Sequence, residues 1–469
     1  MIGFFRNGSP LRLLFLLLLL LLIRLPVLTL GLPLLEPELN WMLVGERMRQ
    51  GHFLYTGIWD SIGPLSAAVY WLIDWQFGRS QSTYQVVALL LTFLQVTLFN
   101  RLTIKNQLYP ENTYLPGLFY VVLMNLCFDF HTLSPVLMAT TFLLLALDKL
   151  FIQLNQRAVS DRVFEAGFYL AVAALFHLPT GVFSLFALVS LLFFGSSDFR
   201  QYFLLIFGFS LPLALTGLIF YLMGNYEGFV RQFVLSLFTV DHQYAVGWQA
   251  ILLLFTLPVV FVFLGVSNVT GSMRYINYQK RCQQIMVVYL IFAGIFLILT
   301  PQLSPAQLIV AVPGVAFFAT PYFLATEKRW LNEVVFGVFF VSSLFLHYAG
   351  LFPSLPTHSL LGLEALRVKP TTLRQPVAGK RVLVLGEGLA EYRLNTVATP
   401  YLNWQLAKKE LLDLDDYQSL INIYRNFEGD LPDVIIDRQR MAKRLFARIP
   451  ALAQRYRPGD EPGVYWRRQ

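Results

Sequence analysis

The sequence predicts a polytopic α-helical membrane protein that ends in a small α/β domain. Of 469 residues, 56% are hydrophobic and 14% are charged, and the mean hydropathy is +0.57. Soluble domains carry about 25% charged residues, so a secreted or cytosolic globule is excluded. Apolar runs recur until about residue 352, after which the composition becomes that of a soluble domain. The chain therefore divides into a membrane domain, 1–352, and a C-terminal domain, 353–469.

Eleven apolar runs bounded by polar loops are the candidate transmembrane helices. They lie at 13–32, 83–100, 115–130, 134–151, 164–176, 178–194, 202–223, 250–266, 285–300, 306–325 and 331–352. No small-residue cleavage site follows the first run, so we expect a retained span rather than a signal peptide. The fifth and sixth runs are separated by His177-Leu178-Pro179 and fit either two short spans or one re-entrant hairpin.

The distribution of basic residues predicts the orientation. Thirteen Lys and Arg residues fall in loops on one side of the predicted spans, and four fall on the other. The positive-inside rule therefore places the N-terminus in the cytoplasm and, after eleven spans, the C-terminal domain outside an inner (plasma) membrane. The net charge of +8 comes mostly from these loops and from the C-terminal domain, so nucleic acid is not an expected partner. Cys127 and Cys282 supply neither a disulfide framework nor a metal set, and no cofactor is predicted.

The C-terminal domain shows alternating strand and helix signals. Strands are expected at 381–385, 433–437 and 463–466, and helices at 401–411, 417–427 and 440–455, the last broken at Pro450. The Gly386-Glu387-Gly388 turn lacks a full GxGxxG pattern, so a plain turn is favoured over a nucleotide site.

The first external loop, 33–82, is the candidate site of chemistry. It is about fifty residues long, and long structured loops usually carry function. Glu36 and Glu38 open it and precede an amphipathic segment ending at Arg49. Asp60 follows in a turn before Gly63-Pro64. Carboxylates at a membrane boundary can act as general bases with a raised pKa. They can equally cap the following helix at its positive N-terminus or stabilise a turn, so both interpretations stay open.

The same loop carries a family resemblance. Arg24-Leu25-Pro26, the acidic pair, the segment 55–60 (YTGIWD) and Gly63-Pro64-Leu65 resemble GT-C membrane glycosyltransferases of the protein mannosyltransferase and aminoarabinose transferase type (glycosyltransferase family 39-like). The whole chain resembles an uncharacterised Bacteroidetes branch of such proteins. The resemblance implies a GT-C-like fold in a bacterial inner membrane, with a periplasmic C-terminal domain.

The resemblance also implies an activity. This is an inverting transfer of a sugar from a polyprenyl-phosphate donor to a lipid, glycan or protein acceptor at the external face. The catalytic base would be Glu38, with Glu36 as its rival and Asp60 beside them. Basic groups stabilise a phosphate leaving group. That role is assigned here to three residues, Arg24, Arg231 and His242. Asp129 and His131 could face the same cavity.

The chain departs from the family pattern in three places. Pro37 interrupts the usual Asp-Glu pair, Ile62 stands where a lysine is usual, and Ala306 stands where an arginine often opens a late span. These departures leave a second hypothesis open, in which a non-catalytic GT-C-like subunit binds membrane protein partners through its basic external domain. No metal site is assigned under either hypothesis.

Overall fold

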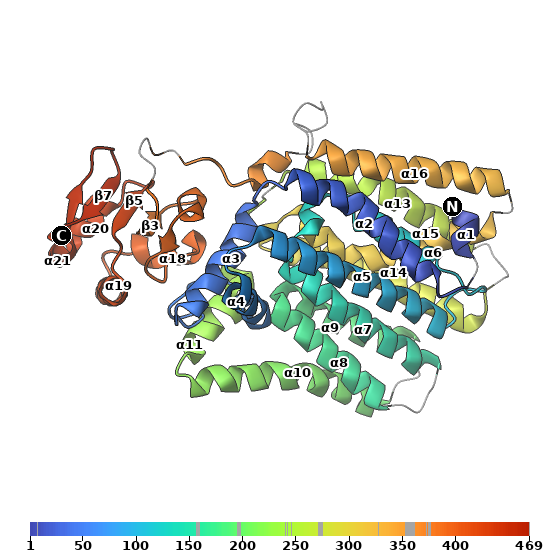
Figure 1. Cartoon of the computed structure of the whole chain (residues 1–469). Coiled ribbons are helices and arrows are strands. Elements are labelled where there is room, and N and C mark those ends of the chain that lie inside the picture. Colours follow the sequence, from blue (N-terminus) through green and yellow to red (C-terminus); the bar gives the residue numbers. More distant parts are fainter. Residues whose placement is uncertain are drawn as a thin grey trace. The chain divides into compact units, whose positions relative to one another are not determined.

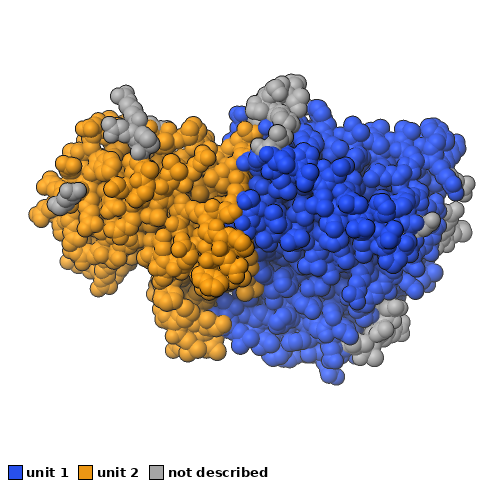
Figure 2. Space-filling view, viewed as in Figure 1, with its two compact units in different colours: residues 1–32, 82–216, 242–365 blue, residues 33–81, 217–241, 366–469 orange. Residues whose placement is uncertain are grey.

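The computed structural model describes residues 1–6, 8–155, 160–194, 198–239, 241, 243–244, 246–270, 275–326, 328–351, 362–371, 373 and 377–468. These residues form two compact units, which Figure 2 distinguishes by colour. Unit 1 comprises 1–32, 82–216 and 242–365, and unit 2 comprises 33–81, 217–241 and 366–469. The sequence-based division kept the first external loop with the membrane domain, whereas in the structure this loop is part of the same unit as the C-terminal segment.

Unit 1 is built from long apolar helices that lie side by side in Figure 1. Its longer helices are α2 (Arg12–Leu30), α5 (Gln81–Lys105), α7 (Pro135–Asn155), α8 (Ser160–Phe176), α10 (Phe199–Leu222), α13 (Trp248–Thr270), α14 (Asn277–Leu299), α15 (Val312–Ala325) and α16 (Arg329–Ala349). Shorter elements are α1 (Ile2–Arg6), α6 (Leu115–Leu123), η1 (Phe128–His131), η2 (Leu178–Val182), α9 (Phe183–Phe194) and η4 (Pro305–Ala311). A short parallel pair joins β1 (Gln243–Tyr244) to β2 (Gln302–Leu303).

The described residues contain eight helices long and apolar enough to cross a membrane. The predicted polytopic α-helical membrane fold is thus confirmed, with fewer full-length spans than the eleven runs suggested. The other three runs form shorter helices. Helix α6 ends at Leu123, well before the end of its run at 130, and the His177-Leu178-Pro179 break separates α8 from α9 through the 3-10 turn η2.

Small residues allow close helix packing in unit 1. A Cβ at Gly265 of α13 would collide with the carbonyl oxygen of Phe318 in α15. A Cβ at Gly167 of α8 would collide with the carbonyl oxygen of Leu205 in α10. Membrane helices associate through such close backbone approaches because no water-driven burial is available between them.

Unit 2 combines the first external loop with the C-terminal α/β segment. The loop forms α3 (Glu36–Arg49) and α4 (Pro64–Phe77), and the middle segment forms α11 (Tyr226–Phe229), the π-helical η3 (Val230–Val234) and α12 (Ser236–Thr239). The C-terminal segment forms β3 (Arg381–Leu385), η6 (Ala390–Arg393), β4 (Thr396–Val397), α18 (Trp404–Leu412), α19 (Tyr417–Gly429), β5 (Val434–Asp437), α20 (Ala442–Arg448), α21 (Pro450–Ala453), β6 (Tyr456–Pro458) and β7 (Val464–Arg467). The short turn η5 (Leu363–Leu366) precedes it.

The C-terminal sheet has the strand order β4-β3-β5-β7-β6. Strands β4, β3 and β5 are parallel, whereas β7 pairs antiparallel with both β5 and β6. The strands predicted at 381–385 and 433–437 form its central pair, and their apolar side chains pack against Leu411, Ile423 and Phe427 of α18 and α19. The predicted small α/β domain is confirmed.

Candidate active site

The candidate carboxylates lie on α3 and in the turn that follows it. Leu35 is the extended N-cap residue of α3, and Glu36 and Glu38 occupy its first turn, where negative charge is favourable. Glu36 and Asn40 share one face of the helix because they are four residues apart, and Glu38 points to another face. The two acids therefore have different surroundings.

Glu36 is half-buried and interacts with the C-terminal segment. Burial raises its pKa, and the nearby charge of Glu387 raises it further. Lys369, Arg438 and a hydrogen bond from the backbone N–H of Leu389 act in the opposite direction. The net result is a carboxyl group with a raised pKa that keeps part of its surface exposed, the combination expected of a general base.

Glu38 is only 1% exposed. Its Oε2 accepts a 2.9 Å hydrogen bond from the side-chain amide of Gln81, whose Nε2 also donates to the carbonyl of Pro33 at 3.4 Å. These contacts join the first turn of α3 to the residues on either side of the loop. In this conformation Glu38 has a structural role.

Asp60 is 3% exposed and well supplied with hydrogen bonds. Its Oδ2 accepts from Asn40 Nδ2 at 2.8 Å, and its Oδ1 accepts from the backbone N–H of Ile62 at 2.8 Å. The Asn403 side chain also donates to it, although burial outweighs these bonds and raises the pKa of Asp60. An aspartate that accepts from the N–H two residues on forms an Asx-turn, so the geometry favours the turn interpretation.

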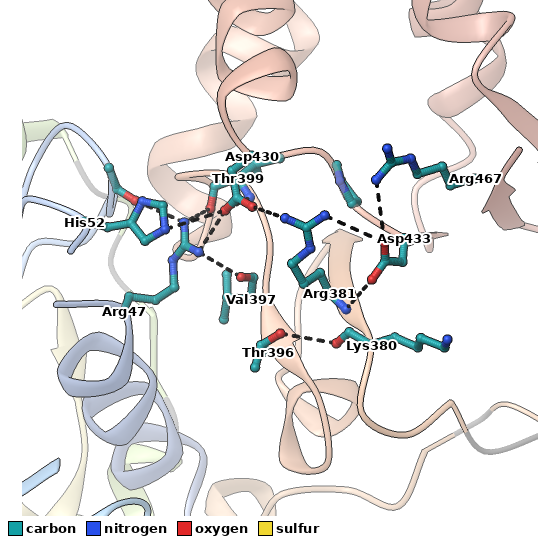
Figure 3. A network of polar contacts seen from close by, with 12 residues as sticks. Arg47, His52, Lys380, Arg381, Thr396, Val397, Thr399, Asp430, Asp433 and Arg467 are labelled. Atoms are coloured by element: carbon teal, nitrogen blue, oxygen red, sulfur yellow. Dashed lines mark hydrogen bonds and ion pairs between the residues drawn. The ribbon is translucent and has the colours of Figure 1, made fainter. Parts of the chain in front are cut away.

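A buried ion pair fixes α3 to the C-terminal segment (Figure 3). Arg47, 3% exposed, pairs with Asp430 at 2.7 Å and donates to the carbonyls of Val397 and Thr399 at 3.0 and 3.3 Å. Burial lowers the pKa of Arg47, and Asp430 partly restores it. Arg381 pairs with the other oxygen of Asp430 at 3.4 Å.

Two further arginines hold the loop in place. Arg79 pairs with Glu46 of α3 and donates to the carbonyls of Tyr392 and Asn395 at 2.7 and 2.8 Å. Arg49 pairs with Asp74 of α4 at 2.5 Å. The sequence analysis did not predict these partners, because Arg47 and Arg79 also bind backbone carbonyls more than 300 residues away and no local pattern indicates such contacts.

Two of the three candidate phosphate-binding residues lie in the part of the chain that the structure describes. Arg231 is exposed on η3, and its charge lowers the pKa of Glu410, which burial raises. Arg24 lies in α2 of unit 1 and is 1% exposed. His242 lies outside the described residues.

Two residues expected to face the same cavity are both buried in unit 1. Asp129 Oδ2 accepts a 2.8 Å hydrogen bond from the backbone N–H of Ala306. Ala306 therefore contributes its backbone to Asp129. His131 contacts the side chain of Asn125 at 3.0 Å. Among the described residues, no group of three or more His, Cys, Asp or Glu side chains is placed to hold a metal ion.

A family model matches residues 64–354, more than half of the chain, and its description is DUF6427, a family of unknown function. The chain belongs to this family. No protein with a curated function matches the sequence of this DUF6427 protein significantly.

Solved structures show what this DUF6427 protein resembles in fold. ArnT from Cupriavidus metallidurans bound to undecaprenyl phosphate aligns with a TM-score of 0.52 and 11% identity, over 76% of this chain and 68% of that chain. ArnT in the apo state gives 0.51 and 14%, over 74% and 67%. The archaeal oligosaccharyltransferase AglB from Archaeoglobus fulgidus gives 0.48 and 11%, over 98% and 75%. The ArnT matches confirm the GT-C resemblance at the level of the fold.

Proposed function

We propose that this DUF6427 protein is an inverting glycosyltransferase that moves a sugar from a polyprenyl-phosphate donor to a hydroxyl acceptor at the external face of a bacterial inner membrane. The observation that carries the proposal is an acidic pair in the first turn of α3, directly after the first span of a GT-C-like fold. The C-terminal segment, which we place in the periplasm, contributes Lys369 and Arg438 near Glu36. The acceptor class, whether lipid, glycan or protein, stays open.

The geometry favours Glu36 over Glu38 as the base. A base must be reached by the hydroxyl whose proton it takes, and Glu36 keeps exposed surface while Glu38 is closed off and bonded to Gln81. The raised pKa of Glu36 brings its basicity closer to that useful near neutral pH. Glu38 and Asp60 then position α3 and the turn after it.

The proposed reaction balances without a redox partner. The Glu36 carboxylate takes the proton of the acceptor hydroxyl as its oxygen attacks the anomeric carbon. The bond between that carbon and the donor phosphate oxygen breaks, and the polyprenyl phosphate leaves with the bonding electron pair. Attack opposite the leaving group inverts the anomeric configuration.

The test measures release of undecaprenyl phosphate by mass spectrometry. Purified protein is incubated with a panel of undecaprenyl-phosphate-linked sugars and a membrane lipid extract as the source of acceptors. We expect at least one donor to be consumed, and Glu36→Gln to lower the rate by about 10²–10⁴-fold, because a positioned general base contributes about that factor.

Glu410→Gln serves as the matched control, because Glu410 is also a partly buried glutamate of unit 2 with a raised pKa but lies on α18. It should leave the rate within a few-fold of the parent. If Glu36→Gln transfers as fast as the parent while Glu38→Gln is inactive with an unchanged melting temperature, the base is Glu38. Full activity in both variants contradicts the proposed mechanism.

A second function is favoured by specific contacts. Asp60 and Glu38 both use their oxygens within the fold, and Ala306 stands where the resembled family pattern often has an arginine. A non-catalytic subunit that binds membrane protein partners needs these carboxylates only to stabilise its fold. Turnover of any donor in the panel excludes it.

A further inference from the structure

Four polar side chains meet in the apolar interior of unit 1. Arg24 comes from α2, Asn125 from the turn after α6, His131 from η1 and His347 from the last turn of α16. All four are at most 2% exposed. Buried polar and charged groups at membrane depth are costly, so a cluster of this kind has a functional explanation by default.

Asn125 organises the cluster. Its Nδ2 donates to the carbonyl of Val121 at 2.7 Å, which leaves Oδ1 as an acceptor. That oxygen receives Arg24 Nε at 3.1 Å and lies 3.0 Å from His131 Nε2. Because Oδ1 can only accept, His131 carries a proton on Nε2.

A structural role explains only part of Arg24. Its Nε is bonded to Asn125, and its Nη2 donates to the carbonyl of Met124 at the end of α6, a favourable position for a cation. Its Nη1, in contrast, is buried and has no hydrogen-bond partner in the part of the chain that the structure describes. Among the described residues, no carboxylate forms an ion pair with Arg24. One face of a buried guanidinium is therefore left for another group.

His347 likewise has hydrogen-bonding groups that the fold does not use. Both of its ring nitrogens are buried, and neither has a hydrogen-bond partner among the residues that the structure describes. Its ring centroid lies 4.7 Å from that of His131, so the two imidazoles pack against each other. A histidine kept only for packing would be replaceable by an apolar ring at lower cost, because leaving a buried polar group without a hydrogen bond is unfavourable.

We propose that Arg24 and His347 form a buried binding site for a phosphoryl group, with His131 packed against His347 and held by Asn125. The Arg24 guanidinium and the His347 imidazole supply N–H donors, which suits an anion, and the positive charge of the guanidinium disfavours a metal cation. A tetrahedral oxyanion would accept from Arg24 Nη1 and from His347, while Asn125 holds Arg24 and His131 in position. The proposal deepens the proposed function, on which it rests for the identification of the phosphoryl group as that of the lipid donor.

Direct binding tests this site without any transfer reaction. Undecaprenyl phosphate is titrated into the purified full-length protein in nanodiscs, and the dissociation constant is read from the shift in melting temperature or by native mass spectrometry. Undecaprenol, which lacks the phosphate, and inorganic phosphate are the two comparison probes. We expect undecaprenyl phosphate to bind and undecaprenol to fail to compete.

The variants separate recognition from folding. Arg24→Lys keeps the charge but loses the planar fork, and should weaken binding about tenfold or more. His347→Gln keeps an amide donor and should weaken it several-fold. His177→Gln is the matched control, because His177 is another histidine of unit 1 with an unpartnered Nε2 outside the cluster, and its affinity should stay within about twofold.

The possible outcomes distinguish the phosphoryl site from the proposed transferase function. If all variants bind undecaprenyl phosphate like the parent, the site is refuted, even if the protein transfers sugar. If inorganic phosphate alone binds with the expected Arg24 dependence, the phosphoryl site stands and its link to the lipid donor fails. If binding depends on Arg24 and His347 but no donor is consumed, the site stands and the proposed transferase function fails.

Discussion

Charged groups of both signs surround Glu36, so its ionisation can be shifted in either direction by conservative changes. Lys369 lowers the pKa of Glu36 and Glu387 raises it. Both neighbours are exposed, so their replacement should leave the fold intact.

If Glu36 is the base, its carboxylate must be deprotonated, and the rate rises as pH passes upward through its pKa. Removing the cation in Lys369→Met raises this pKa, so the acid limb of the kcat/KM profile should move to higher pH. Removing the like charge in Glu387→Gln lowers it, so the limb should move to lower pH. Nearby charges shift pKa values by about one unit or more when close and partly buried.

The control is Lys443→Met, an exposed lysine on α20 that does not affect Glu36. Its profile should overlay that of the parent. Two shifts of the same sign, or no shift in either variant, would assign the acid limb to a group other than Glu36.

Residue identity was the most predictable part of the candidate site. The acidic pair directly follows the first span, Arg24 lies inside that span, and Asp60 lies in the same external loop as the pair. Their relative roles were not predictable, because they depend on which carboxylates the fold buries and hydrogen-bonds. Gln81 donates to Glu38, and Asn403 donates to Asp60. Both dependences come from tertiary contacts rather than local pattern.

At the scale of elements, α3 is held at two sides. Its contact with α4 is tight, because a Cβ at Gly45 would lie 2.6 Å from the carbonyl oxygen of Tyr70. We expect Gly45→Ala to destabilise the protein by about 1–3 kcal/mol, the usual cost of overpacking. Gly337→Ala in α16 is the control, since nothing lies within 4 Å of its Cβ position. Melting temperatures compare the two, and an equal response would show that α3 and α4 can separate freely.

The other side of α3 depends on the Arg47–Asp430 pair. Asp430→Asn leaves the buried Arg47 guanidinium without its carboxylate and should cost roughly 3–5 kcal/mol, whereas Arg47→Met leaves Asp430 paired with Arg381 and should cost less. The double variant should cost less than the sum, because neither charge is then left unpaired. Unfolding of the four proteins gives the coupling energy. Strict additivity would mean that the pair does not connect α3 to the C-terminal segment.

Most helices and strands were predictable from apolar periodicity. The segments after residue 380 matched closely, including the break at Pro450, because alternating apolar residues and prolines mark them locally. The two-residue strand β4 and the edge strand β6 were missed. Each is specified by pairing with a neighbour rather than by its own composition.

At the scale of the whole molecule, the positive-inside rule makes a prediction about sidedness. Arg281 lies on the predicted cytoplasmic side and Arg457 on the external side, and both are exposed. A membrane-impermeant maleimide applied to intact spheroplasts should label Arg457→Cys and leave Arg281→Cys unlabelled until the membrane is opened. The native Cys127 and Cys282 are buried, so background labelling should be low. The reverse pattern would invert the predicted topology.

The grouping into units was the least predictable feature. Composition can mark a boundary only between neighbouring stretches of sequence, whereas each unit combines stretches that are far apart in sequence. Unit 2 is assembled from three separated segments. Sequence reasoning places a boundary where polarity changes, whereas buried ion pairs such as Arg47 with Asp430 unite distant segments.

This discontinuity constrains biosynthesis. The ribosome delivers α3 first, but Val397, Thr399 and Asp430, which pair with Arg47, emerge at least 350 residues later. Until then a guanidinium destined for the interior must stay hydrated, so α3 cannot reach its final state during insertion of the middle helices. Completion of α3 therefore depends on synthesis of the C-terminal segment. A chain interrupted before Asp430 would leave α3 without these contacts and exposed to quality-control proteases.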